Sequence, residues 1–211
     1  YNVKEGVALA IKKAKTASKP IVLLDCADRT GDTTWVLQEL LAQRAQNAAI
    51  PLLYDTEAVN ICNEAGVGKT VELKVGANSG WNDGGPVKVK GKVLWVGEGK
   101  YIGTGPMTKN REIDHGLTAI IKVNGIWLQL ITYPALSMPG LVDEDPIIQF
   151  GYKTGDFDII VTKSKTHFRA VYEKVAEEII IADAPGQCPT DLSVFQYKNV
   201  PHGVYPITRK D

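Results

Sequence analysis

The chain has 211 residues, of which 44% are hydrophobic and 23% charged, a balance typical of a globular protein with a sizeable core. Its 24 basic and 24 acidic side chains give a formal net charge of zero, so no overall field attracts nucleic acid or an anionic membrane, and we expect neither as a partner. No apolar run approaches the ~20 residues that cross a bilayer, and zero charge favours self-association, so a homo-oligomer is a further expectation.

The three cysteines, Cys26, Cys62 and Cys188, have neither the number nor the spacing of a disulfide framework or a zinc site. We expect buried, reduced thiols, and therefore a reducing compartment, the cytoplasm. No signal-peptide pattern is present. Because the chain begins at Tyr1 and enters a helical pattern at once, we expect it to be a fragment of a longer protein.

Helices and strands alternate in the first third of the chain. Residues 3–14 have apolar side chains at helical spacing, and a second helical pattern covers 36–41. Continuous apolar runs at 21–24 and 50–54 are typical of buried strands. Residues 55–66 predict a third helix, which begins at an aspartate cap and ends at a glycine. This alternation predicts a parallel α/β layer.

The middle of the chain has a different pattern. Polar and apolar residues alternate with period two, and Asn124-Gly125 separates two apolar runs, which is the strongest short signal for a hairpin. Residues 70–133 are therefore predicted to be mostly antiparallel β-structure, with strands at 70–75, 87–93, 119–123 and 126–130.

The last third returns to the α/β pattern. Strands are predicted at 158–162 and 178–182, separated by a helix that Ser164 or Thr166 would cap, and residues 185–211 form an irregular tail. The fold class predicted is α/β: a mixed sheet with flanking helices and a β-rich antiparallel insertion. We expect one domain over 1–211, in which segments 1–66 and 156–184 form the α/β part and 70–133 the insertion.

Five groups of segments, in order, are similar to one family over nearly the whole chain. They are 21–28 (IVLLDCAD) with 31–34 (GDTT); 54–59 (YDTEAV) with 65–68 (AGVG); 105–107 (GPM) with 116–119 (GLTA); 163–170 (KSKTHFRA); and 183–186 (DAPG) with 205–206 (YP). Together they resemble the C-terminal domain of the MlrC-like, or microcystinase C-type, zinc metallopeptidases.

The resemblance implies a hydrolase that cleaves peptides, linearised microcystin or related molecules, with a zinc-activated water. In that family an N-terminal domain of the same polypeptide binds the zinc, so we expect that domain and a peptide substrate as partners and no activity from this fragment alone. No catalytic or metal-ligand residue is assigned to this chain, because His115, His167 and His202 are far apart and lack HExxH-like spacing.

The chain departs from the family at one loop. Between the Ala-Asp and Gly-Asp-Thr elements the family has a longer, glycine-rich loop, whereas only three residues separate Asp28 from Asp32 here. Glycine-rich loops can present backbone N–H groups to an anion, and the short loop puts that role in doubt. We expect the segment from Asp28 to Asp32 to be mobile or broken; the alternative is a true short loop.

Three carboxylates, Asp25, Asp28 and Asp32, follow the first predicted strand, with Thr33 beside them. Ligands collect at the carboxyl ends of strands in open α/β sheets, so these residues are candidates for contact with substrate or with the other domain. They could also hold a divalent cation. The alternative is local: Asp32 caps the next helix, and Asp25 and Asp28 stabilise the turn.

A second candidate group surrounds the later strand-to-helix turn. Lys163, Lys165, His167 and Arg169 could attract a substrate carboxylate at the start of a helix. The alternative is a solvated basic turn.

Trp81 lies in a polar, glycine-rich segment and is a candidate contact for substrate or the other domain, unless it folds back on the β layer. Two functions remain open: part of a metallopeptidase that shapes its peptide site, or a non-catalytic interaction or dimerisation module. For the first, we expect an exposed apolar face at the first helix and at the loops near Asp25 and Lys163. For the second, residues 70–133 would form the interface.

Overall fold

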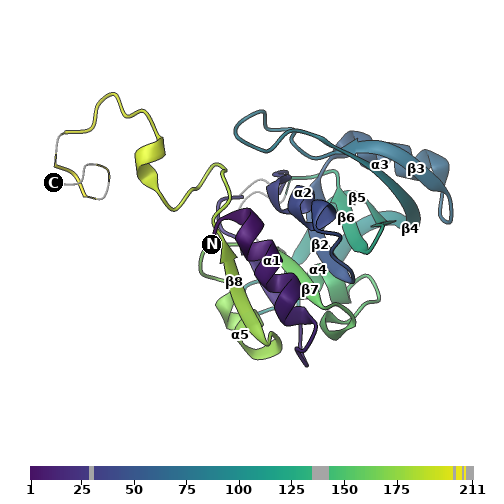
Figure 1. Ribbon diagram of the computed structural model, residues 1–211. Helices are drawn as coiled ribbons and strands as arrows, with labels where there is room; N and C mark the ends of the chain where they lie inside the picture. The colour runs from purple at the N-terminus through teal and green to yellow at the C-terminus, as the bar shows by residue number, and fades with distance from the viewer. Residues whose placement is uncertain (29–30, 135–142, 202, 206, 208–211) are drawn as a thin grey trace.

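One eight-stranded sheet organises the chain (Figure 1). The computed structural model describes residues 1–28, 31–134, 143–201, 203–205 and 207. The strand order is β3-β4-β5-β6-β2-β7-β1-β8. The strands are β1 (Ile21–Asp25), β2 (Ala48–Tyr54), β3 (Thr70–Val75), β4 (Val87–Ile102), β5 (Glu112–Val123), β6 (Ile126–Ile131), β7 (Ile159–Lys163) and β8 (Glu178–Ala182).

The sheet is mixed. The pairs β6-β2, β2-β7, β7-β1 and β1-β8 are parallel, and the pairs among β3, β4, β5 and β6 are antiparallel. The predicted α/β fold class is confirmed, and the antiparallel strands extend the parallel layer instead of forming a separate one. Asn124 and Gly125 do form the turn between β5 and β6, with Asn124 at a φ of 52°.

Helices cover both faces of the sheet. They are α1 (Val3–Ala14), α2 (Trp35–Ala42), α3 (Thr56–Ala65), α4 (Asp145–Ile148) and α5 (Arg169–Val175), and there are two short 3-10 turns, η1 (Thr154–Asp156) and η2 (Leu192–Val194). The helices α1, α2 and α3 share one core with the sheet, whereas α4 and the start of α5 belong to the core on the opposite face. None of the helices in the described residues is both long and apolar enough to cross a bilayer.

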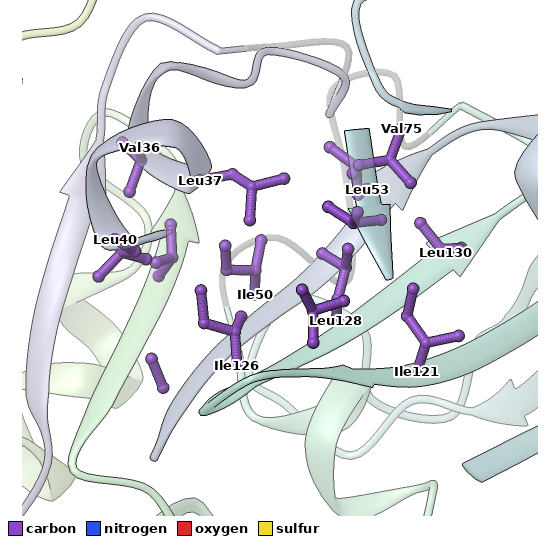
Figure 2. Packing of buried hydrophobic residues seen from close by; sticks show 14 of the residues in the cluster. Val36, Leu37, Leu40, Ile50, Leu53, Val75, Ile121, Ile126, Leu128 and Leu130 are labelled. Carbon is purple, nitrogen blue, oxygen red and sulfur yellow. The ribbon is translucent and has the colours of Figure 1, made fainter. Parts of the chain in front are cut away.

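The larger core lies beneath α2 and α3. Leu37 and Leu40 of α2 meet Ile50 and Leu53 of β2 and Leu128 of β6, as Figure 2 shows. These side chains are buried and aliphatic, so their removal from water stabilises the sheet against the helices. β1 and β7 are buried along their whole length because this core lies on one side and a core around Phe168 and Tyr172 on the other.

Two crossover connections leave adjacent strands and pass over opposite faces of the sheet. The connection β1–α2–β2 passes over β7 on one face, and β7–α5–β8 passes over β1 on the other. β1 and β7 are adjacent and parallel, with Asp25 opposite Lys163 in register. A crevice outside the carboxyl ends of strands at such a switch point is where open α/β sheets bind ligands.

The sequence predicts some helix ends correctly and others wrongly. Asp55 caps α3 by accepting a hydrogen bond from the Ala58 N–H, and α3 ends at Gly66 with a φ of 84°, as predicted. The predicted cap of α5 by Ser164 or Thr166 is wrong: Phe168 precedes that helix, and no side chain caps it.

Candidate functional site at the carboxyl edge of the sheet

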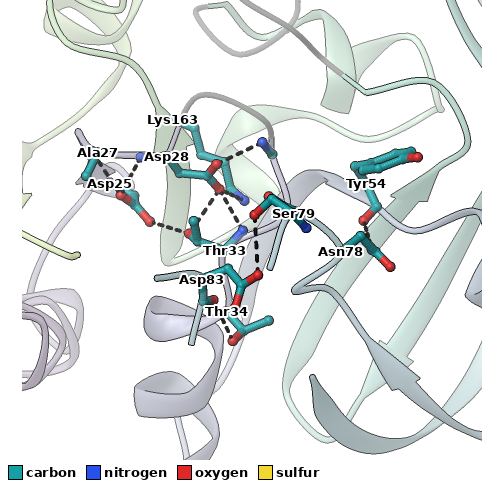
Figure 3. A network of polar contacts seen from close by, with 12 residues as sticks. Asp25, Ala27, Asp28, Thr33, Thr34, Tyr54, Asn78, Ser79, Asp83 and Lys163 are labelled. Atoms are coloured by element: carbon teal, nitrogen blue, oxygen red, sulfur yellow. Dashed lines mark hydrogen bonds and ion pairs between the residues drawn. The ribbon is translucent and has the colours of Figure 1, made fainter. Parts of the chain in front are cut away.

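The candidate residues after β1 form a buried polar network, drawn in Figure 3. Asp25, Asp28, Thr33 and Lys163 are all at most 5% exposed. β1 and β7 bring them together, since Asp25 ends one strand and Lys163 the other. The structure therefore unites part of the predicted acidic group with part of the predicted basic group.

Asp25 holds the turn that follows β1. One carboxylate oxygen accepts from the N–H groups of Ala27 and Asp28, both at 3.2 Å, and the other lies 3.1 Å from the Thr33 hydroxyl. Burial, then repulsion from Asp28, raises the pKa of Asp25 to about 6 against the attraction of Lys163.

Asp28 is the charged partner of Lys163. Its Oδ2 lies 2.5 Å from the ammonium Nζ and accepts from the Thr33 N–H at 3.2 Å. Its Oδ1 accepts from the Gly31 N–H at 2.8 Å. Burial opposes ionisation of Asp28, but the adjacent ammonium outweighs it and lowers the pKa of this carboxyl. These contacts agree with the alternative in which Asp25 and Asp28 stabilise the turn.

Asp32 has a different role from the expected helix cap. Thr34 precedes α2 and makes no side-chain capping bond, whereas the Asp32 carboxylate accepts from the Ser79 N–H at 2.6 Å. The Asp32 carbonyl also accepts from Ala77 at 2.7 Å. The capping alternative is wrong: Thr34 occupies the N-cap position of α2, and the Asp32 carboxylate binds the loop between β3 and β4, a contact that no local pattern of residues predicts.

Residues 29 and 30 lie outside the described residues, so the expectation of a mobile or broken segment is not tested there. On either side of them, Asp28, Gly31 and Asp32 are buried, and Asp28 accepts from the Gly31 N–H.

The other basic candidates do not join the network. Lys165, His167 and Arg169 are exposed. Lys165 reaches the Pro189 carbonyl of the tail at 3.4 Å, and Arg169 pairs with Glu173 at 2.8 Å. The predicted basic group is therefore split. Lys163 forms a buried ion pair, whereas the other three residues lie on the surface.

Arg169 borders an open cavity of about 910 Å³ on the far side of α5. Lys109 and Lys174 also line it, together with the acidic Glu144 and Glu173. With both signs of charge present, this cavity has no clear preference for an anion.

Trp81 is 43% exposed and does not fold back on the β layer. Its ring stacks on Phe195 of the tail, with 5.7 Å between ring centroids and 7° between planes. No sequence signal connected these two residues, which are more than a hundred positions apart.

A second buried carboxylate pair was missed by the sequence reasoning. Asp143 and Asp145 both lie near the Thr108 hydroxyl, each at 3.1 Å, and Asp145 also accepts from the Thr104 N–H at 2.8 Å. Burial and then repulsion from Asp145 raise the pKa of Asp143 to about 6. The signals in the sequence that could have indicated this pair are the Asp-x-Asp spacing and the Gly103–Gly105 turn. Gly105 allows the close approach, since a β-carbon there would lie 2.3 Å from the Asp143 side chain.

The histidines in the described residues do not lie together. His115 is buried, with its Nε2 3.1 Å from the Tyr101 hydroxyl, and burial lowers its pKa to about 4. His167 is exposed, and His202 lies outside the described residues.

The described residues do not fit a catalytic metal ion. In that part of the chain no three His, Cys, Asp or Glu side chains are grouped closely enough to hold one. The oxygens of Asp25 and Asp28 already face backbone N–H groups, a hydroxyl and an ammonium. A cation beside Asp28 would have to displace the Lys163 charge.

The three cysteines are free thiols. Cys26 and Cys62 are buried as expected, and burial raises the pKa of both, that of Cys62 to about 11. Cys188 is only half-buried, because the tail that carries it lies on the surface.

Comparison with known proteins agrees with the fold and the motifs. A crystal structure from Mesorhizobium sp. BNC1, described as a "putative metallopeptidase", superposes with a TM-score of 0.82 at 21% identity; the match covers 97% of this chain and 41% of that one. This chain therefore spans less than half the length of that protein. No curated protein matches the sequence. The family model described as MlrC C-terminus matches residues 27–199, and the chain belongs to that family.

Proposed function

We propose that this chain is the C-terminal domain of a metallopeptidase that hydrolyses peptides and binds its zinc in an N-terminal domain of the same polypeptide. The observation that carries the proposal is the family match over residues 27–199, which begins just after β1 and includes the carboxyl ends of β2, β7 and β8. The substrate class that the resemblance suggests is linearised microcystin or a related peptide. Free, buried thiols favour a reducing compartment, the cytoplasm, for this activity.

In this proposal zinc in the other domain supplies the activated water. The residues of this chain bind and orient. The buried contacts among Asp25, Asp28, Thr33 and Lys163 hold the turn after β1 in one conformation. Lys165 and His167 would meet a substrate carboxylate; their exposure just after β7 supports this role.

The test uses the full-length polypeptide and linear peptides. We expect hydrolysis that is lost on chelation and restored by zinc, and none from residues 1–211 alone. Replacing Lys165 or His167 by Ala should lower kcat/KM about tenfold, because a hydrogen bond to a charged group is worth about 1.5 kcal/mol or more. Lys122→Ala, an exposed lysine near the opposite edge of the sheet, is the control and should leave kcat/KM unchanged.

A non-catalytic interaction module is the second candidate, favoured by the burial of Asp25, Asp28 and Lys163, none of which can touch a substrate in this chain. Under this function the full-length protein still hydrolyses peptides, but Lys165→Ala and His167→Ala act like Lys122→Ala. Absence of zinc-dependent hydrolysis by the full-length protein would refute the first proposal altogether.

A further inference from the structure

Exposed aromatic side chains gather where the β3–β4 loop meets the tail. Trp81 stacks on Phe195, and Phe195 in turn contacts Tyr197 edge to face with 6.0 Å between ring centroids. Trp81 is 43% exposed, Tyr197 40% and the neighbouring Val194 60%. These four residues are named the aromatic patch here. Trp and Tyr are the residues most often found at the energetic centre of protein interfaces.

The loop presents Trp81 in a preordered position. Residues 76–86 are bound to the start of α2. The Thr34 hydroxyl lies 3.1 Å from the Asp83 carbonyl and 2.7 Å from the Gly85 carbonyl, and the Trp35 indole donates to the Asn82 carbonyl at 3.0 Å. Within the loop, Asp83 accepts from the Gly80 N–H at 2.7 Å. A side chain held in this way loses little freedom when a partner covers it, which favours binding.

The tail is bound at its base and then leaves the body. Cys188 donates to the Ala27 carbonyl at 3.1 Å, and Thr190 donates to Asp183 at 2.7 Å. Beyond these contacts Figure 1 shows the tail, η2 included, extending past β8 away from the sheet. Among the aromatic contacts of the described residues, the stack of Phe195 on Trp81 joins the tail to the body.

The course of the tail has a counterpart in a longer protein. The similarity to the Mesorhizobium structure covers 97% of this chain. The unmatched part is shorter than the tail, so the match includes residues of the tail. The family model also extends into the tail, to residue 199. This chain spans only 41% of that protein. A segment that leaves its own domain and still belongs to the family fold is expected to pack against something outside the domain.

We propose that the aromatic patch is the docking surface for the rest of the polypeptide, the domain to which the proposed function assigns the metal. The inference rests on the proposed function for the identity of that domain. It also corrects the expectation about α1, because the large apolar side chains of that helix are buried or half-buried. Asp32, which accepts from the Ser79 N–H, connects the patch to the buried network.

Hydrogen exchange of the full-length protein tests the docking. Trp81→Ala should speed exchange about tenfold or more in the tail and in a segment outside residues 1–211, because truncating an aromatic hot spot weakens an interface by at least that factor. Phe195→Ala should do the same, and Trp81→Phe should retain most of the protection. Val67→Ala is the matched control. Val67 is 61% exposed and lies just after the C-terminal end of α3.

Three results would overturn the proposal. One is faster exchange confined to the loop and tail of this chain, which would mean that the stack serves only this domain. Another is loss of a homodimer in light scattering with no change outside residues 1–211, which would assign the patch to a second copy. The third is equal behaviour of Trp81→Ala and Val67→Ala. None of these readouts requires peptidase activity, so a failed hydrolysis assay leaves the docking test intact.

Discussion

At the scale of single residues, the Thr33 hydroxyl lies between two carboxyl groups. It is 3.1 Å from Asp25 and 3.0 Å from Asp28, yet a hydroxyl has one proton to donate. Asp28 is the better acceptor because it is charged and paired with Lys163. The arrangement is fully hydrogen-bonded when Asp25 carries a proton and donates it to Thr33, which agrees with the raised pKa of Asp25.

This charge state predicts a pH dependence for Asp25. The folded protein holds a proton on Asp25 up to about pH 6, whereas the unfolded chain releases it near pH 4. The contribution of Asp25 to stability is therefore present at pH 4 and is lost as the pH rises through 6, by about 2–3 kcal/mol. Asp25→Asn places an amide N–H where the acid proton lies, so it should stabilise the protein at pH 8 and make no difference at pH 4.

Chemical denaturation from pH 4 to 8 measures the effect. The difference between Asp25→Asn and wild type cancels the contributions of Asp143 and His115, which titrate in both proteins. Asp28→Asn is the contrasting variant. It leaves the Lys163 ammonium buried without its partner, so it should cost about 3–5 kcal/mol at pH 8. A stability difference between Asp25→Asn and wild type that is the same at pH 4 and pH 8 would rule out the protonated acid.

At the scale of elements, the loop between β3 and β4 is held by close backbone packing against the start of α2. Gly76 has a φ of 75°, and a β-carbon there would lie 2.6 Å from the Thr34 side chain and 3.0 Å from the Asp32 carbonyl. Gly80, in the same loop, has a φ of 68° but open space around it. The two glycines have similar backbone strain and different surroundings.

Gly76→Ala and Gly80→Ala separate these two effects. Gly80→Ala should cost about 1–2 kcal/mol, the penalty of a left-handed backbone for an L-residue. Gly76→Ala should cost about 1–3 kcal/mol more, since the loop must move away from Thr34. Urea unfolding of both variants checks this, and equal losses would show that the close approach at Gly76 relaxes without cost.

At the scale of the whole molecule, this chain supplies a scaffold without a metal centre of its own in the described residues. The polar side chains at the switch point bind one another, so their hydrogen-bonding groups already have partners within this chain. The proposed function accordingly assigns the metal ligands to the other domain.

Zinc should therefore have little effect on this chain alone. Ligands that bind only the native state raise Tm, so a tenfold molar excess of zinc over residues 1–211 should shift Tm by less than about 1 °C. The full-length protein in the same experiment should show a clear rise. Calorimetry with and without zinc makes the comparison, and a stoichiometric zinc site in residues 1–211 would contradict the proposed division between domains.

Local patterns of residues were enough to identify most elements and their classes. Apolar runs of four or five residues marked β1, β2 and β7, since strands buried on both faces need apolar residues at every position. A similar run marked β8, although this edge strand is only partly buried. Alternation marked β3 and the turn at Asn124 marked the β5–β6 hairpin, because both signals depend on neighbours in the chain. Asp55 and Gly66 bounded α3 for the same reason.

Which of these elements are neighbours could be learned only from the three-dimensional fold. The order of β7 beside β1 brings Lys163 to Asp28, and the curve of the β3–β4 hairpin brings Ser79 to Asp32. It also places Phe195 on Trp81. Each of these contacts joins residues far apart in the sequence, and their pairing follows from how the whole sheet buries its two faces, which no local pattern of residues encodes.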